Sequence, residues 1–382
     1  MKEYGSSINN ISIKESLKVK EVGSDFDEKW IAFIYGNPQA TIYHHPLWFS
    51  IIEEESGQKV LRLVCMNESD EIVGILPLQY TKGIPFKFGG LLTAKRLSSL
   101  PRTPFGGPIV INNKVLMKLI QEAVKIVSDE PNRLLQIKVL EEFDIDETNK
   151  FHKFLWRETY IKEIPDFPEE IRFGNSKNHT KIKWAVNKAL QNNVKYRIAE
   201  SESDLKIWYK LYLSTMRFHV TPARSYKFFS LLWKILRPEG LMRLALAELE
   251  INGKKVIIAG SIFFYYNESV IYAFNGSSRV REHFELRPND LIHWETILDA
   301  QKKGYKIYHL GEVSKNQSGL ASYKKKWGTN IVKMYHYYYP NSIQLETDEL
   351  DTNVTEGFKE KIYSRLPLNL TAKISEMVYK RL

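Results

Sequence analysis

The stretch that decides the fold is RVREHFELRPNDLIHWETILDAQKKGYKIYHLGEVSKNQSGLASYKKKWG, residues 279–328. After a basic turn, Pro288 starts a helix and Gly304 ends it, because proline suits the first helical position and glycine the position after the last. The apolar run YKIYHLGE then predicts a strand. A Gly/Ser loop follows, and the stretch closes on three consecutive lysines between Tyr323 and Trp327. This order of elements is typical of an α/β protein.

The rest of the chain shows two similar sets of elements. Apolar residues at helical spacing predict helices, and short apolar runs bounded by turn residues predict strands. In the first half, helices are expected at residues 46–56 and 113–129, and strands at 59–66, 71–80 and 133–140. In the second half, helices are expected at residues 201–219 and 224–236, and strands at 241–249, 255–266 and 269–278. The halves share an order of elements without obvious residue identity.

The segment EIPDFPEEIRFG separates the halves, because two prolines and a charge cluster interrupt both periodicities. We therefore expect a first domain at residues 1–165 and a second at 166–340. Beyond residue 340 the composition turns acidic, and residues 341–382 are expected to form an acidic linker and a C-terminal amphipathic helix.

The C-terminal helix has an apolar stripe of Leu370, Ile374, Met377 and Val378 at helical spacing. Such a stripe either contacts an anionic membrane surface or docks on the protein's own body. The sequence leaves both open.

The composition describes a globular, basic protein. With 382 residues, of which 43% are hydrophobic, the chain is long enough for two cores. Its formal net charge of +10 favours an anionic partner such as RNA, a nucleotide, coenzyme A or a membrane. The single cysteine, Cys65, lies in an apolar run and is expected to be a small buried hydrophobe. No stretch resembles a signal peptide or a membrane span, so we expect a cytoplasmic protein, peripheral at the inner face of the membrane where its C-terminal helix binds lipid.

Three common kinds of site are absent from the sequence. The nine histidines have no cysteine companions and no HExxH spacing, so no metal is expected, and the adjacent His44 and His45 fit a turn that leads into a helix. The glycine-rich stretches lack the GxxxxGKS or GxxxxGKT order of a phosphate-binding loop. No GxSxG motif occurs, which argues against a serine hydrolase.

Taken together, the basic turn, RPNDLIHWE, GYKIYHLG and GLASYKKKWG resemble the Fem-type (FemAB-like) aminoacyltransferases and the related BioF-like and CelD-like acyltransferases of the GNAT superfamily. TIYHHPLWF, EIVGILPLQY and STMRFHVTPARSYKFF also resemble family blocks, so the resemblance covers about residues 40–340. It implies two tandem GNAT-like domains, each a mixed sheet flanked by helices, with a cleft for donor and acceptor. In relatives the strand after the lysine motif crosses back, so residues 331–340 are expected to pair with the first domain.

The resemblance also assigns residues. The family motif Phe-Lys-x-x-Phe/Trp-Gly maps onto residues 323–328, with a tyrosine in place of the usual phenylalanine. It implies that Lys324 stabilises negative charge during transfer and that Tyr323 packs beside it. Expected contacts to the anionic groups of the donor come from Lys326, Arg281 and Asn289. Expected contacts to the acceptor come from Arg217 and His219, and the proton acceptor is left open between Glu295 and Glu312.

The implied reaction moves an activated acyl or aminoacyl group onto an amine or hydroxyl of a cell-envelope or polysaccharide-related acceptor. No tightly bound cofactor is expected, and acyl-CoA, an acyl-carrier protein and aminoacyl-tRNA remain open as donors. The superfamily's acyl-CoA signature is absent from residues 279–287, and no long coiled-coil arm for tRNA interrupts the chain. The alternative is a non-enzymatic nucleic-acid-binding protein, motivated by the net positive charge and by the basic residues of 176–197. Without the family motif, the three consecutive lysines would be interpreted as a charge run that lies in solvent.

Overall fold

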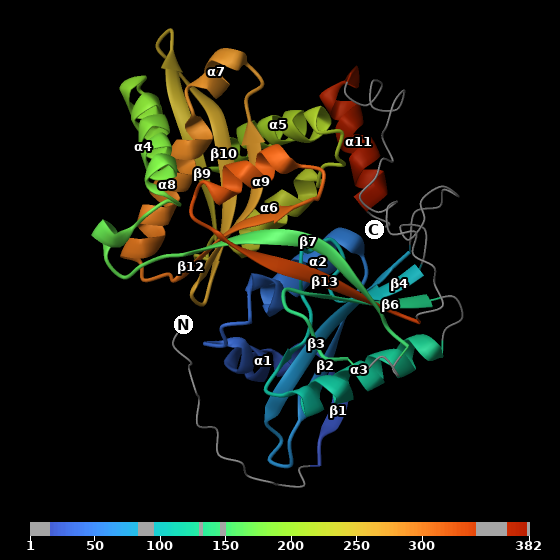
Figure 1. The fold of residues 1–382 in the computed structure, drawn as a ribbon. Coiled ribbons are helices and arrows are strands. Elements are labelled where there is room, and N and C mark those ends of the chain that lie inside the picture. The colour runs from blue at the N-terminus through green and yellow to red at the C-terminus, as the bar shows by residue number, and fades with distance from the viewer. Residues whose placement is uncertain (1–15, 83–94, 130–132, 146–149, 341–364, 380–382) are drawn as a thin grey trace.

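The computed structural model of the protein describes residues 16–82, 95–129, 133–145, 150–340 and 365–379 (Figure 1). The first half contains β1 (Lys18–Val22), α1 (Asp27–Ile34), α2 (Pro46–Ser56), β2 (Val60–Met66), β3 (Ile72–Thr81), β4 (Lys95–Ser98), β5 (Ile109–Val110), α3 (Asn113–Ser128), β6 (Arg133–Val139) and β7 (His152–Glu163). The second half contains α4 (Ser176–Gln191), β8 (Lys195–Ile198), α5 (Glu202–Phe218), α6 (Tyr226–Ile235), β9 (Met242–Ile251), β10 (Lys254–Tyr266), β11 (Ser269–Ser277), α7 (Arg281–Glu285), α8 (Pro288–Lys302), β12 (Ile307–Val313), α9 (Ser318–Lys325) and β13 (Asn330–Tyr339). The helix α11 (Leu368–Tyr379) follows.

One mixed sheet runs through both halves. Its strand order is β1-β2-β3-β4-β6-β13-β7-β12-β11-β10-β9-β8, and β5 pairs with β3. The pairs β4–β6 and β11–β12 are parallel, and the other pairs are antiparallel. A parallel pair needs a crossover connection, which α3 supplies in the first half and α8 in the second. The α/β fold class expected from the sequence is confirmed.

The last strand of each half lies beside a strand of the other half. β13 pairs with β6 and β7, and β7 also pairs with β12. Figure 1 shows β7 and β13 crossing the middle of the molecule, where they join the two halves. Because the strands are shared in this way, a division into two domains near residue 165 stays a prediction.

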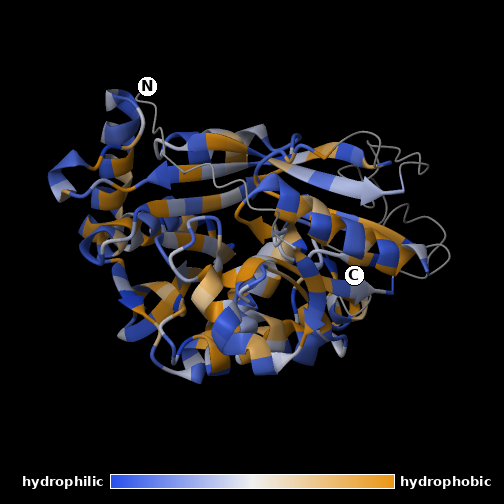
Figure 2. Ribbon diagram, turned by 90° about the horizontal axis from the view of Figure 1, so that it is seen from below, coloured by the Kyte–Doolittle hydropathy of each residue, from blue (hydrophilic) through white to orange (hydrophobic). Residues whose placement is uncertain are grey.

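Hydrophobic clusters cover both faces of the sheet. In the first half the buried side of α3 packs on Leu97, Leu135 and Ile137, which alternate with polar residues along β4 and β6. A second cluster joins the halves, and in it the ring of Trp48 from α2 lies 5.9 Å from that of Phe228 in α6. Hydrophobic and hydrophilic residues alternate along strands and helices (Figure 2).

Local signals in the sequence explain several element ends. Helix α2 begins at Pro46, with the side chain of His45 accepting a hydrogen bond from the Leu47 backbone, and ends before Gly57 at φ 70°. The expected turn at His44 and His45 is therefore confirmed, and Cys65 is fully buried as expected. The prediction of a Gly/Ser loop before the lysine cluster is wrong in part, because the later residues of this segment form α9. Apart from one glycine, this segment consists of residues that tolerate a helix well.

The C-terminal helix docks on α5. Its residues Thr371 and Ser375 are buried, whereas Leu370 and Met377 are 43% and 52% exposed. The helix thus docks with these small polar residues and with Leu368 and Ala372, and it leaves part of its apolar stripe in solvent. The acidic linker and the side chain of Val378 lie outside the described residues. Within the described part of the chain, no helix has the length and apolar character needed to cross a membrane.

Candidate active site

A cavity of about 670 Å³ lies where the two halves meet, a size that suits small-molecule substrates. The first half contributes the start of α2, the loop at residues 101–105, and the strands β4, β6 and β7. The second half contributes β11, β12, α9 and β13. The cavity is therefore bounded by both parallel strand pairs of the sheet.

On the side of the second half, the strands β11 and β12 border the cavity. They pair only at residues 269–271 and 307–309, and beyond these residues they diverge. Residues 272–274 of β11 and 310–312 of β12 then line the cavity from two sides. Beyond their paired residues both strands therefore face the cavity.

Gly311 shapes the end of β12. Its φ of 78° is one that side-chain-bearing residues rarely adopt, and a Cβ there would lie 3.5 Å from Nζ of Lys324. The register of β12 against β7 also shifts between His309 and Glu312. Irregularities of this kind re-aim side chains, and here Glu312 turns into the cavity.

The three consecutive lysines of α9 lie in different environments, because successive residues of a helix point about 100° apart. Lys324 lines the cavity and is 5% exposed, and its Nζ donates a hydrogen bond to the carbonyl oxygen of Glu312 over 3.0 Å. Lys325 is exposed to solvent. Burial lowers the pKa of Lys324 from 10.5 to about 8, although Glu312 acts in the opposite direction. The solvated charge run considered for this cluster describes Lys325 alone.

Tyr323 and Lys326 support α9 from behind and do not line the cavity. The ring of Tyr323 packs 6.5 Å from that of Trp327, which is fully buried. Nζ of Lys326 lies 2.5 Å from a carboxylate oxygen of Asp290 and 4.2 Å from the centre of the Tyr323 ring. An anion-binding role of Lys326 therefore competes with an ion pair inside the protein.

The other residues assigned from the sequence lie away from the cavity. Arg281 is exposed on α7 and pairs with a glutamate of the same helix, and Asn289 accepts a hydrogen bond from a serine of β11. Arg217 donates to the carbonyl of Leu366, ahead of α11, over 2.9 Å, and His219 follows α5 at the surface. The structure does not bring these four side chains to Lys324, and their donor and acceptor roles stay predictions.

Most cationic residues of the cavity were missed at the sequence level. Among the described lining residues, six side chains are cationic and the carboxylate is that of Glu312. The six are Arg96, Arg102, Lys138, Arg157, Arg224 and Lys324. A signal for Lys138 existed in the strand RLLQIKVL, in which two polar residues alternate with apolar ones. Strand β7, which carries Arg157, was not predicted at all.

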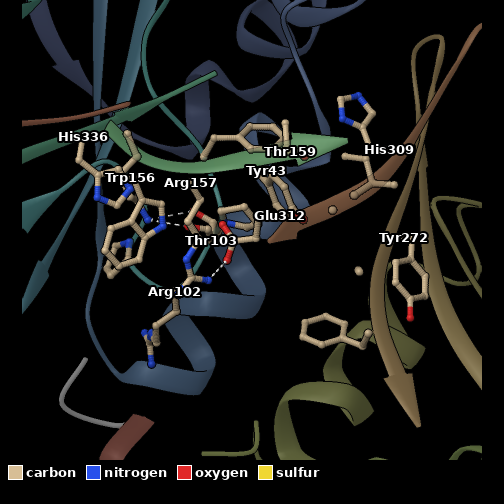
Figure 3. A pocket seen from close by; sticks show the side chains of 18 of the residues that line it. Tyr43, Arg102, Thr103, Trp156, Arg157, Thr159, Tyr272, His309, Glu312 and His336 are labelled. Atoms are coloured by element: carbon tan, nitrogen blue, oxygen red, sulfur yellow. Dashed lines mark hydrogen bonds and ion pairs between the residues drawn. The ribbon is translucent and has the colours of Figure 1, made fainter. Parts of the chain in front are cut away.

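Two ion pairs organise part of this charge. Nη1 of Arg157 lies 2.7 Å from Oε1 of Glu312, and Nη1 of Arg224 lies 2.6 Å from Oε2 of Glu55. Figure 3 shows Arg157 and Glu312 facing each other inside the cavity. The second carboxylate oxygen of Glu312, Oε2, is buried and has no hydrogen-bond partner. It is therefore free to accept a proton or a hydrogen bond from a substrate.

Two further groups of the cavity are neutral near pH 7. Burial lowers the pKa of His309 to about 4 and raises that of Tyr43 above its usual range. In the described part of the chain, no three histidine, cysteine, aspartate or glutamate side chains are grouped to hold a metal ion.

Comparisons with known proteins address the family. Residues 176–325 match the acetyltransferase (GNAT) domain family. The fold resembles the crystal structure of FemX, with 16% identity and a TM-score of 0.64 over 84% of this chain and 96% of FemX. It also resembles the C-terminal domain of a putative lysylphosphatidylglycerol synthetase from Agrobacterium fabrum, with 11% identity and a TM-score of 0.53 over 86% and 96%. The structure of L-PGS from Bacillus licheniformis is similar as well, with 10% identity and a TM-score of 0.53 over 91% of this chain and 99% of L-PGS. No curated protein sequence matches the chain.

The matched residues contain the diverging strands β11 and β12 and all of α9, including Lys324. The match favours the transferase prediction over a non-enzymatic nucleic-acid-binding protein. Residues 176–325 thus match an acetyltransferase (GNAT) domain, which indicates an acyl- or aminoacyltransferase enzyme, and the fold of the chain resembles that of FemX.

Proposed function

We propose that the chain transfers an acyl or aminoacyl group, bound between β11 and β12, to an amine or hydroxyl of a cell-envelope or glycan-related acceptor in the cavity. The observation that carries this proposal is the position of Lys324. The helix α9 places its buried ammonium group at the opening between the two strands, next to Glu312. A buried cation in a cavity stabilises negative charge more strongly than the same cation in water.

In the proposed step the acceptor nitrogen or oxygen attacks the carbonyl carbon of an acyl ester or thioester. The new bond forms, the carbonyl oxygen becomes an oxyanion, and the bond to the leaving oxygen or sulfur then breaks. Lys324 stabilises the negative charge on the oxyanion or on the leaving group. The proton lost by the nucleophile passes to Oε2 of Glu312, and the leaving group finally takes up a proton from solvent.

Glu312 is the better of the two carboxylates left open by the sequence. It lines the cavity, and its Oε1 is held by Arg157 while Oε2 is buried without a partner. Glu295 lies on α8 and does not line the cavity. A proton acceptor must reach the attacking group directly or through one water, which only Glu312 of the two can do in this cavity.

The donor and acceptor classes rest on the family. A GNAT domain generally takes an acyl-CoA donor, whereas Fem-type relatives are aminoacyltransferases. The similarity to FemX and to lysylphosphatidylglycerol synthetases supports an envelope acceptor for this chain. Contact of α11 with the inner face of the membrane would bring the enzyme to such an acceptor.

The test compares two neighbouring lysines. Lys324→Met removes the buried charge and keeps the length of the side chain, and Lys325→Met makes the same change on the exposed face of α9. Transfer of labelled acyl groups from acyl-CoAs, acyl-carrier proteins and aminoacyl-tRNAs to envelope precursors is measured by mass spectrometry. We expect a loss of about 100-fold or more for Lys324→Met.

The control variant Lys325→Met should keep the activity of the unaltered chain. Lys324→Met should remain folded by circular dichroism, because it removes a buried charge. Full activity of a folded Lys324→Met variant would overturn the proposal.

A further inference from the structure

The centre of the sheet presents a polar face to the cavity. It consists of alternate residues of β4, β6 and β13 that line the cavity, namely Arg96, Gln136, Lys138, His336 and Tyr338, together with Ser98, which is fully buried on the same side of the sheet. The register places Ser98 beside Gln136, Gln136 beside Tyr338, and Lys138 beside His336. Side chains opposite each other on neighbouring strands point to the same side of a sheet. These residues therefore form one continuous polar face.

Hydrogen bonds within the polar face fix the tautomer of His336. Oγ of Ser98 donates to Oε1 of Gln136 over 2.8 Å, so the amide nitrogen of Gln136 points to the hydroxyl of Tyr338, 2.9 Å away. That hydroxyl accepts from Gln136, and its own proton goes to Nδ1 of His336 over 3.2 Å. Burial keeps the pKa of His336 well below 6.5, so the ring is neutral. Its remaining proton is therefore on Nε2.

Two buried donors of this face have no partner. Nε2 of His336 and Nε of Arg96 make no hydrogen bond, although their side chains are only 4% and 7% exposed. Within the described residues no carboxylate forms an ion pair with Arg96. Nζ of Lys138 is held by the carbonyl oxygens of Leu100 and Thr103 at 2.6 and 2.7 Å. The neutral carbonyls give Lys138 no ion pair, and the carboxylate that acts on it, Glu312, is already paired with Arg157.

Unpaired buried charges and donors are costly, and an anion bound between them would offset that cost. We propose that Arg96, Lys138 and His336 form a subsite for an acidic group, a carboxylate or a phosphate, of the acceptor. This inference rests on the proposed transfer reaction for the identity of the ligand as acceptor. The subsite lies in the same cavity as Lys324 and Glu312 but on the side of the first half, away from the opening between β11 and β12.

The ring of Trp156 adds a flat wall to the subsite. It stacks on His336 with 4.6 Å between ring centres and an angle of 17° between the planes. Figure 3 shows His336 and Trp156 together at one side of the cavity and Tyr272 at the other. An acceptor that carries its acidic group on a sugar or another ring would place that ring along Trp156. Its amine or hydroxyl would then extend toward Glu312.

The first experiment measures binding to the full chain without any donor. Thermal unfolding and titration calorimetry are carried out with inorganic phosphate, glucuronate and uncharged methyl glucoside. We expect the two anions to raise the melting temperature and the neutral sugar to have no effect, because a ligand of the native state stabilises it by mass action. The stronger of the two anions identifies the acidic group as phosphate or carboxylate. Absence of any anion-dependent shift would overturn the subsite.

The second experiment compares neighbouring residues of one strand. Arg96→Gln removes the buried charge, and Lys95→Met alters the adjacent exposed residue of β4. Loss of a charge-assisted hydrogen bond should weaken glucuronate binding about tenfold or more in Arg96→Gln, and Lys95→Met should bind normally. Lys138→Met, which removes a buried ammonium group, should also weaken binding and replaces Arg96→Gln if the latter does not fold. Unchanged affinity in folded variants of both residues would refute the subsite.

Lys324→Met separates this inference from the proposed function. It should abolish transfer and keep glucuronate binding. If no transfer is ever found while Arg96 governs anion binding, the subsite stands and the proposed function fails. If transfer proceeds on neutral and acidic acceptors alike, and Arg96→Gln leaves the acceptor KM unchanged, the function stands and the subsite fails.

Proton uptake provides an independent readout. Burial lowers the pKa of Lys138 to about 7, and a bound anion raises it again, so glucuronate should bind most tightly below pH 7 and more weakly as the pH rises above it. The charged and titratable groups that act on Lys138 come from β4, the loop after it, the loop before α6, β12 and β13. They are Arg96, Arg102, Arg224, Glu312 and His336. Lys138→Met should bind independently of pH in this range, and a retained pH dependence would refute this role of Lys138.

Discussion

The two halves of the chain have a similar order of elements, yet they bring different chemistry to the cavity. In the first half the parallel pair β4–β6 carries Arg96 and Lys138 toward it. In the second half the parallel pair β11–β12 diverges and lines it with Tyr272, Phe274 and Leu310. The difference teaches that a shared scaffold can provide an anionic-group subsite at one end and an apolar opening at the other. Reaction is proposed between them, at Lys324 and Glu312.

The largest effect is expected where the two halves meet, at the ion pair of Glu312 from β12 with Arg157 from β7. Glu312→Gln keeps a carbonyl oxygen for Arg157 and removes the proton acceptor. We expect kcat to fall by about 100-fold or more, the usual contribution of a positioned base, with little change in the acceptor KM. Steady-state kinetics with Glu295→Gln as the control check this. A folded Glu312→Gln variant with an unchanged kcat, or with no greater loss than Glu295→Gln, would contradict the role of Glu312 as the proton acceptor.

The pH dependence of kcat tests the role of Lys324, which the second half contributes to the cavity. Lys324 stabilises developing negative charge only as an ammonium ion, and its pKa of about 8 places its deprotonation above that pH. We therefore expect kcat to fall about tenfold per pH unit above pH 8, relative to Lys324→Arg, which stays protonated. The ratio of the two pH profiles removes the titration of the acceptor itself. A ratio that rises through pH 8 would instead make Lys324 a general base.

A smaller effect is expected at Gly311, the glycine that shapes the end of β12 in the second half. Gly311 and Gly304 have φ of 78° and 79°, but only at Gly311 would a Cβ approach other atoms, namely the carbonyl oxygen of Tyr272 at 3.4 Å and Nζ of Lys324. Alanine at either position should cost about 1–2 kcal/mol of stability through backbone strain. Denaturant unfolding measures this cost. Only Gly311→Ala should also lower kcat severalfold, and an equal kinetic loss in Gly304→Ala would contradict the proposed role of Gly311.

Much of the fold could be predicted from the sequence because its elements are set by local signals. Pro46 and Pro288 start helices as expected, and the apolar runs of β2, β3 and β6 form strands. The partner of each strand was harder to predict. The family resemblance suggested that the strand after the lysine motif crosses back, but β7 escaped prediction because HKFLWRETYIKE mixes charged and apolar residues without a clean alternation.

The candidate site could be predicted only where a motif marked it. Lys324 was found through its family motif, although charge statistics alone would place it in solvent. Arg96 and Lys138 were missed because each is one polar residue in an apolar strand, and their convergence depends on the pairing of β4, β6 and β13. In the block STMRFHVTPARSYKFF, Arg217 was chosen, whereas Arg224 lines the cavity. Which of the two arginines points into the cavity depends on where α5 ends and where α6 begins. The spacing of residues in the sequence does not reveal these two end points.

The smallest effect is expected from helix α11, which lies outside the cavity and docks on α5 of the second half. We expect Leu370→Ser combined with Met377→Ser to weaken binding to vesicles containing phosphatidylglycerol about threefold, because two exposed apolar side chains would no longer enter the membrane surface. Ile111→Ser, at a residue of the first half that is 58% exposed, is the matched control. Vesicle sedimentation measures the binding. If a chain that ends at Pro340 binds as well as the full chain, α11 has no membrane role and serves only as a helix packed on α5.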